Sequence, residues 1–119
     1  MTLNRKMRLA AVMGCALLVL AGCSLGRHSP QECMERAMYF ESNRSSRDGM
    51  IAVGSVVMNR VQSDKFPNSV CAVVGQKNQF APGVLTRKMD SRSMPMVQEA
   101  ARSVLRGERH PMVADAMFS

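Results

Sequence analysis

The stretch QECMERAMYFES, residues 31–42, has the spacing of an amphipathic helix and decides how the chain folds. At about 100° per residue, its apolar positions Met34, Ala37 and Met38 share one face with Glu41. The other two glutamates do not share the centre of that face. Burial of a carboxyl group at the end of an apolar stripe would favour its protonated form, which a general acid requires. The alternative interpretation of Glu41 is a helix-end glutamate that hydrogen-bonds to a nearby cap.

Three further helices are expected. Residues 47–62 have a helical stripe of valines, with Ser45 as the N-cap and Asp48 in its capping box. Residues 70–74 predict a short helix, and a last helix begins at the cap Ser93 and ends at Gly107. Residues 76–92 read as a long exposed loop, which in so small a domain is typical of binding loops. The tail 114–118 is ambiguous and is considered as a strand.

The first part of the chain has the layout of an export signal. A basic start is followed by an apolar run that is too short for a comfortable membrane span, and the run ends at Cys23. The small residues before Cys23 resemble a lipobox, which implies cleavage there and lipidation of the thiol. We therefore expect a signal peptide over 1–22, a tether over 23–30 and one domain over 31–119. Ser24 after the cysteine favours the periplasmic face of the outer membrane; a plain signal peptide or an uncleaved anchor is the alternative.

Charge and cysteine content narrow the class of protein. The chain has 119 residues and a net charge of +7. Without the three basic residues of the export signal the balance is 13 − 9 = +4, a mildly basic surface that suits an anionic polymer such as peptidoglycan or nucleic acid, with a simply solvated surface as the alternative. Nucleic-acid binding is disfavoured because no known motif or interleaved aromatic pattern is present. Cys33 and Cys71 remain as an even pair in an exported protein, so a disulfide between them is expected, with two separate buried thiols as the alternative.

Other catalytic chemistries fit the sequence poorly. His28 and His110 are its two histidines and form no zinc-binding pair, so we expect no metal and no cofactor. Cys33 with His110 as base would give a cysteine peptidase, but Glu32 opposes the thiolate. A single acid such as Glu41 suffices for a lytic transglycosylase, in which the sugar's own hydroxyl attacks.

Several blocks in order carry a family resemblance: AMYFE ending at Glu41, VVMNRV at 56–61, FPNSVC at 66–71, and Gln79 with Phe80. Together they resemble the cell wall hydrolase family of spore-cortex-lytic enzymes. The resemblance implies a mostly α, lysozyme-like α+β domain with minor β that cleaves peptidoglycan glycan strands as a lytic transglycosylase or muramidase. It places the catalytic glutamate at Glu41.

The same resemblance implies further site residues and partners. Gln79, Phe80 and Tyr39 are expected to bind substrate, and Asn59 is expected to tie its helix to the next loop. Peptidoglycan is the expected partner, with the membrane reached through a lipid and the protein a monomer.

Two departures from the family pattern bear on activity. The family usually has Glu-Ala-Arg-Gly-Glu where this chain has Glu41-Ser42-Asn43-Arg44-Ser45, so the turn glycine is Arg44 and the second glutamate is Ser45. The family also continues beyond the segment that ends this sequence. A non-catalytic wall-binding or structural lipoprotein with the same fold is therefore the competing hypothesis.

Overall fold

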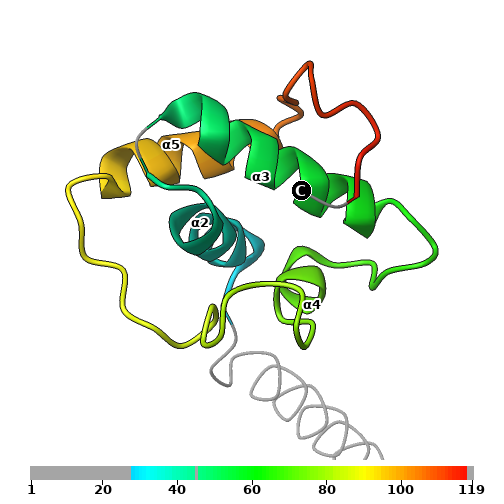
Figure 1. Cartoon of the computed structure of the whole chain (residues 1–119), viewed down its shortest axis with the longest axis horizontal. Coiled ribbons are helices and arrows are strands. Elements are labelled where there is room, and N and C mark those ends of the chain that lie inside the picture. The colour runs from blue at the N-terminus through cyan, green and yellow to red at the C-terminus, as the bar shows by residue number, and fades with distance from the viewer. Residues whose placement is uncertain (1–27, 45, 118–119) are drawn as a thin grey trace, which may run out of the picture.

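A computed structural model describes residues 28–44 and 46–117, which form a small helical domain. Figure 1 shows α3 (Arg47–Val61) and α5 (Met94–Leu105) lying alongside each other, with α2 (Pro30–Glu41) packed beneath them. The short helix α4 (Val70–Val74) packs against α2 and α3. The mostly α architecture predicted from the sequence is confirmed. The minor β structure is not found, because the described residues contain no strand and the tail from Ala114 to Met117 forms a turn and an irregular segment.

Serine caps begin three of the four helices in the described part of the chain. The hydroxyls of Ser29, Ser46 and Ser69 each accept a hydrogen bond from a backbone N–H in the first turn of α2, α3 and α4. The cap of α3 is therefore Ser46; the predicted cap, Ser45, lies outside the described residues. Ser93 stands at the start of α5 as predicted, but its side chain makes no capping bond and instead contacts the Ser91 hydroxyl.

The core lies where α2, α3 and α5 meet. Fully buried methionine and valine side chains from these helices fill it, as the helical stripes predicted. Gly54 permits the close approach of the helices: a Cβ there would lie 2.7 Å from the Met38 Cε and 3.0 Å from a Val104 methyl carbon. The α3 helix can therefore approach α2 and α5 together only through a residue without a side chain at this position.

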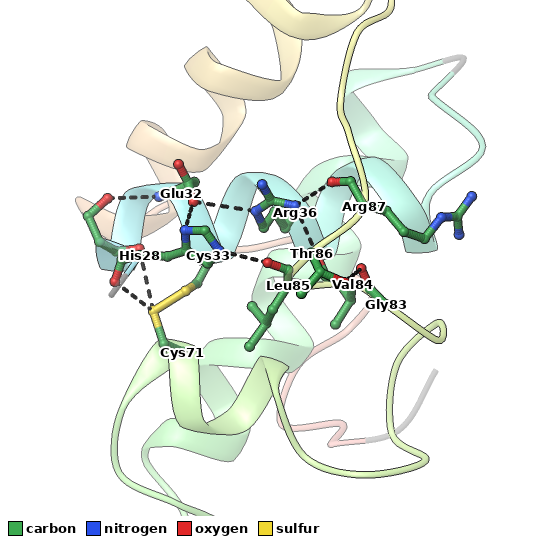
Figure 2. A network of polar contacts seen from close by, with 11 residues as sticks. His28, Glu32, Cys33, Arg36, Cys71, Gly83, Val84, Leu85, Thr86 and Arg87 are labelled. Carbon is green, nitrogen blue, oxygen red and sulfur yellow. Dashed lines mark hydrogen bonds and ion pairs between the residues drawn. A yellow bond between two sulfur atoms is a disulfide. The ribbon is translucent and has the colours of Figure 1, made fainter. Parts of the chain in front are cut away.

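Two features fix the end of α5 and the position of α4. Gly107 ends α5 as predicted, with a φ of +122°, and the following N–H of Glu108 donates to the Ser103 carbonyl at 3.0 Å. The expected disulfide is present: Cys33 of α2 is bonded to Cys71 of α4 (Figure 2). Within the described part of the chain, no helix is long and apolar enough to cross a membrane.

Candidate active site

Glu41 is the last residue of α2, and its side chain is exposed. The apolar stripe that precedes it is buried as predicted, with Met34, Ala37 and Met38 fully inaccessible. The burial expected for Glu41 itself is wrong. The helix ends at this residue, so its carboxyl group projects beyond the edge of the core.

The Glu41 carboxyl group lines a small pocket of about 80 Å³. Val53, Val56 and Arg60 of α3 form one wall, and Gln79 and Phe80 of the loop after α4 form the other. The structure thus brings together three residues that the sequence assigned to one site: Glu41, Gln79 and Phe80. Among the pocket-lining residues in the described part of the chain, Glu41 is the single carboxylate.

A backbone donor from the loop fixes the carboxyl group in place. The N–H of Ala81 donates to Glu41 Oε1 at 2.7 Å. The alternative interpretation of Glu41 expected a hydrogen bond to a nearby helix cap. The observed donor belongs instead to the long loop. The loop orients one carboxyl oxygen, and the other carboxyl oxygen remains available for proton transfer.

Arg60 is one of the site residues that the sequence interpretation missed. It is only 4% exposed, and its guanidinium carbon lies 5.2 Å from the ring centres of both Phe66 and Phe80. Its Nε donates to the Met117 carbonyl at 2.5 Å. Burial lowers the pKa of Arg60 below its ordinary value, and the charge of Glu41 opposes this shift.

A signal for Arg60 was present in the helix pattern. Arg60 follows Val53 and Val56 by seven and four residues, so it lies on the same face of α3. A cation at the end of an apolar stripe is the counterpart of the carboxylate that ends the stripe of α2. The family resemblance in the block Asn59-Arg60-Val61 implies a role for the asparagine alone.

Tyr39 does not line the Glu41 pocket. It is buried, its hydroxyl accepts a hydrogen bond from the Asp90 N–H at 3.4 Å, and the Arg44 guanidinium lies 4.5 Å from its ring centre. In this structure Tyr39 therefore contacts the loop and the turn after α2. Arg44 replaces the family's turn glycine yet has a φ of +59°, so the turn keeps a conformation that glycine adopts more readily.

Asn59 forms hydrogen bonds to a segment distant in sequence, and not to the loop that follows its helix. Its Nδ2 donates to the carbonyls of Ala114 and Ala116 at 2.9 and 2.8 Å. With the bond from Arg60 to Met117, these contacts attach the C-terminal segment to the end of α3 (Figure 1). This segment therefore supports the buried side of Arg60.

The competing chemistries find little support in the described residues. Cys33 is bonded to Cys71 and is fully buried, so it offers no free thiol to His110. The His110 ring instead lies 3.0 Å from the Asp48 carboxylate. No three His, Cys, Asp or Glu side chains come together as a metal-binding group across residues 28–44 and 46–117. Cys23, the predicted lipid site, lies outside the described residues.

The sequence matches a family model described as Cell Wall Hydrolase over residues 44–118, and the chain belongs to this family. The matched region includes Arg60, Gln79, Phe80 and Ala81, and it begins three residues after Glu41.

Particular relatives are spore cortex-lytic enzymes. The chain is 31% identical over 72 residues to the spore cortex-lytic enzyme of Bacillus subtilis, which covers 60% of this chain and 22% of that protein. It is 32% identical over 74 residues to the spore cortex-lytic enzyme of Bacillus cereus, covering 62% of this chain and 27% of that protein. The chain thus spans about a quarter of the length of these relatives. No solved structure matches it.

Proposed function

We propose that this chain cleaves the glycan backbone of peptidoglycan, with Glu41 as the general acid. The observation that carries the proposal is the pocket in which the Glu41 carboxyl group meets Gln79 and Phe80, in a chain that belongs to the cell wall hydrolase family. The names of the relatives, spore cortex-lytic enzymes, support a lytic role on a cell wall layer.

In the proposed reaction, Glu41 gives its proton to the glycosidic oxygen next to the muramic acid sugar. The Ala81 N–H holds Oε1, so the second carboxyl oxygen carries the proton. After transfer, the carboxylate is left beside the positive charge of Arg60, which stabilises it as the sugar gains oxocarbenium character.

The outcome that we propose is that of a lytic transglycosylase. A glycosidase that uses water usually needs a second carboxylate as base or nucleophile. Glu41 has no such partner among the described residues that line its pocket. Attack by the sugar's own hydroxyl requires none, because the Glu41 carboxylate left after the first transfer takes the proton that this hydroxyl loses. Mass spectrometry of the products decides this point: anhydro-muropeptides support the transglycosylase, and hydrolysed muropeptides contradict it.

The competing function is a wall-binding lipoprotein without catalysis. Its support is that Glu41 is exposed and that Ser45 stands where the family has a second glutamate. A zymogram on purified peptidoglycan separates the two functions. Clearing by the native protein that is lost in Glu41→Gln supports the enzyme, and equal clearing by both overturns the role of Glu41. No clearing by either, with retention of the protein on peptidoglycan, favours the binding function.

We also propose that the protein is exported and lipid-anchored through Cys23, on the periplasmic face of the outer membrane. The basic start, the apolar run and the small residues before Cys23 support this proposal. Metabolic labelling with a radioactive fatty acid tests it: the native protein should be labelled and Cys23→Ser should not. Equal labelling of both would exclude Cys23 as the anchor.

A further inference from the structure

The loop between α4 and α5 lines a second, larger and open pocket. Its volume is about 310 Å³, and residues 75–78 and 80–86 line it. Phe80 lines this pocket and the Glu41 pocket alike. Ala81 lines the second pocket while its N–H holds Glu41. The two pockets are therefore neighbours that share the Phe80–Ala81 segment as a wall.

The wall of the loop pocket is fixed from outside by α2 and by His28, which precedes this helix. Arg36 donates to the carbonyls of Arg87 at 2.6 Å and Val84 at 3.4 Å, and His28 Nε2 lies 2.7 Å from the Leu85 carbonyl. Figure 2 shows Arg36 of α2, and His28 just before this helix, reaching to the loop. The loop is therefore held in shape before a ligand arrives, which lowers the entropy cost of binding.

The polar chemistry of the pocket fits a ligand with amide N–H groups. Gln76 is one of its lining residues, and Gln76 Oε1 is buried with no hydrogen-bond partner among the described residues. A buried acceptor without a donor is unfavourable, so a ligand N–H that reaches it would be stabilised. The remaining walls are largely apolar, with Val84, Leu85 and Phe80 contributing.

The charge of the loop fits an anionic ligand. Residues 75–89 contain three cations and no acidic residue. Arg87 lies over the Phe40 ring at 4.6 Å, and Lys88 lies 3.7 Å from Asp90. Lys77 lines the pocket, is exposed and forms no ion pair within the described parts of the chain. Lys77 is thus the cation best placed to meet a carboxylate of a bound ligand.

We propose that the loop pocket binds the acidic stem peptide of peptidoglycan while the sugar that carries this peptide lies against the mouth of the Glu41 pocket. The stem peptide combines the two properties that the pocket selects: amide N–H groups for Gln76 and carboxylates for Lys77. It is attached to the muramic acid next to the scissile bond, so sugar and peptide must occupy adjacent sites. This inference rests on the proposed function and specifies how the substrate is recognised.

The test compares Lys77→Gln with the matched control Lys65→Gln, an exposed lysine outside both pockets. The first probe is the stem peptide released from peptidoglycan by an amidase, titrated into the purified protein and followed by calorimetry. We expect the native protein and Lys65→Gln to bind it equally and Lys77→Gln to bind about two- to fivefold more weakly, as for loss of an exposed ion pair. Absence of binding by the native protein, or equal binding by both variants, would overturn the proposal.

The second measurement uses cleavage of intact peptidoglycan and of glycan strands stripped of peptide. Lys77→Gln should raise KM on intact peptidoglycan with kcat unchanged, and should leave cleavage of the stripped strands as in the native protein. An equal rise of KM on both substrates would assign the pocket to a sugar and overturn the proposal. If no glycan is cleaved but peptide binding still depends on Lys77, the proposed catalysis fails while the peptide site stands.

Discussion

At the scale of single residues, the site depends on a contact between a side chain and a backbone group far apart in sequence. Glu41 could be selected from the helical spacing of α2, but the Ala81 N–H that orients it belongs to a loop. Every residue except proline has a backbone N–H, so the residue type at position 81 does not predict this hydrogen bond. Arg60, by contrast, was detectable from its place on the face of α3 that carries Val53 and Val56.

Removal of the Ala81 donor should therefore reduce activity without removing the acid. A hydrogen bond to a charged group contributes about 1.5–3 kcal/mol, so Ala81→Pro should lower kcat by roughly ten- to a hundredfold. Ala81→Gly keeps the N–H and should stay near the native rate. The two kcat values are measured beside thermal unfolding of each variant. Equal rates in both would show that the bond does not position Glu41.

At the scale of elements, the two glycines of α3 have opposite roles. A Cβ at Gly54 would meet Met38 Cε at 2.7 Å and two Val104 methyl carbons at 3.0 and 3.1 Å, whereas a Cβ at Gly49 meets nothing closer than 3.4 Å. The Met38 end can rotate, but the stiff Val104 side chain must shift. We expect Gly54→Ala to lower the free energy of unfolding by about 1–2 kcal/mol.

Gly49→Ala is the control for that variant. It should raise the free energy of unfolding by up to about 1 kcal/mol, because alanine favours a helix over glycine. Urea unfolding of both variants measures the contrast in sign. A gain in stability from Gly54→Ala equal to that from Gly49→Ala would contradict the close packing of α3 on α2 and α5.

The ion-pair network between α3 and α5 should make stability depend on pH. Arg47 bonds to Glu99 at 2.7 and 2.9 Å and to Glu108 at 2.6 and 2.8 Å. These bonds from Arg47, with one from Ser103, lower the pKa of Glu108 to about 2, and Arg47 also lowers the pKa of Glu99. Because the folded-state pKa values are depressed, the stabilisation is complete above about pH 4.5 and is lost as the pH falls towards 2.

Unfolding free energies measured between pH 5 and 2.5 check this dependence. The native protein should lose stability more steeply than Glu108→Gln over that range. Asp64→Asn is the control, because Asp64 is exposed and forms no ion pair with the other described residues. Its stability should follow the same pH curve as that of the native protein. Identical slopes for the native protein and Glu108→Gln would contradict the role of the network.

The elements were predictable where their signals are local. The apolar spacing of α2, the valine stripe of α3, and Ser93 and Gly107 at the two ends of α5 placed these helices within a residue or two. The exposure of Glu41 was not predictable, because it depends on where α2 ends relative to the neighbouring helices. The same reason applies to Asn59, whose partners Ala114 and Ala116 are brought to it only by tertiary folding.

At the scale of the whole molecule, a disulfide joins α2 to α4, just before the pocket-forming loop. The Cys33–Cys71 disulfide spans a separation of 38 residues, which in the chain-entropy model stabilises the fold by about 4 kcal/mol. Reduction should lower the urea midpoint accordingly, and this is measured on the same protein with and without dithiothreitol. An unchanged midpoint with both thiols shown to be free would remove the disulfide as a source of stability.

The central claim is that Glu41 supplies the proton for cleavage of the glycan strand. Its most direct test is the initial rate of muropeptide release from purified peptidoglycan by Glu41→Gln, compared with Glu35→Gln. Glu35 lies on the same helix, bonds to Gln31 and does not line the Glu41 pocket, so it controls for loss of a carboxylate from α2. We predict that Glu41→Gln loses at least about a hundredfold in rate, the usual contribution of general acid catalysis, while Glu35→Gln keeps the native rate. Equal rates for the two variants would contradict the claim.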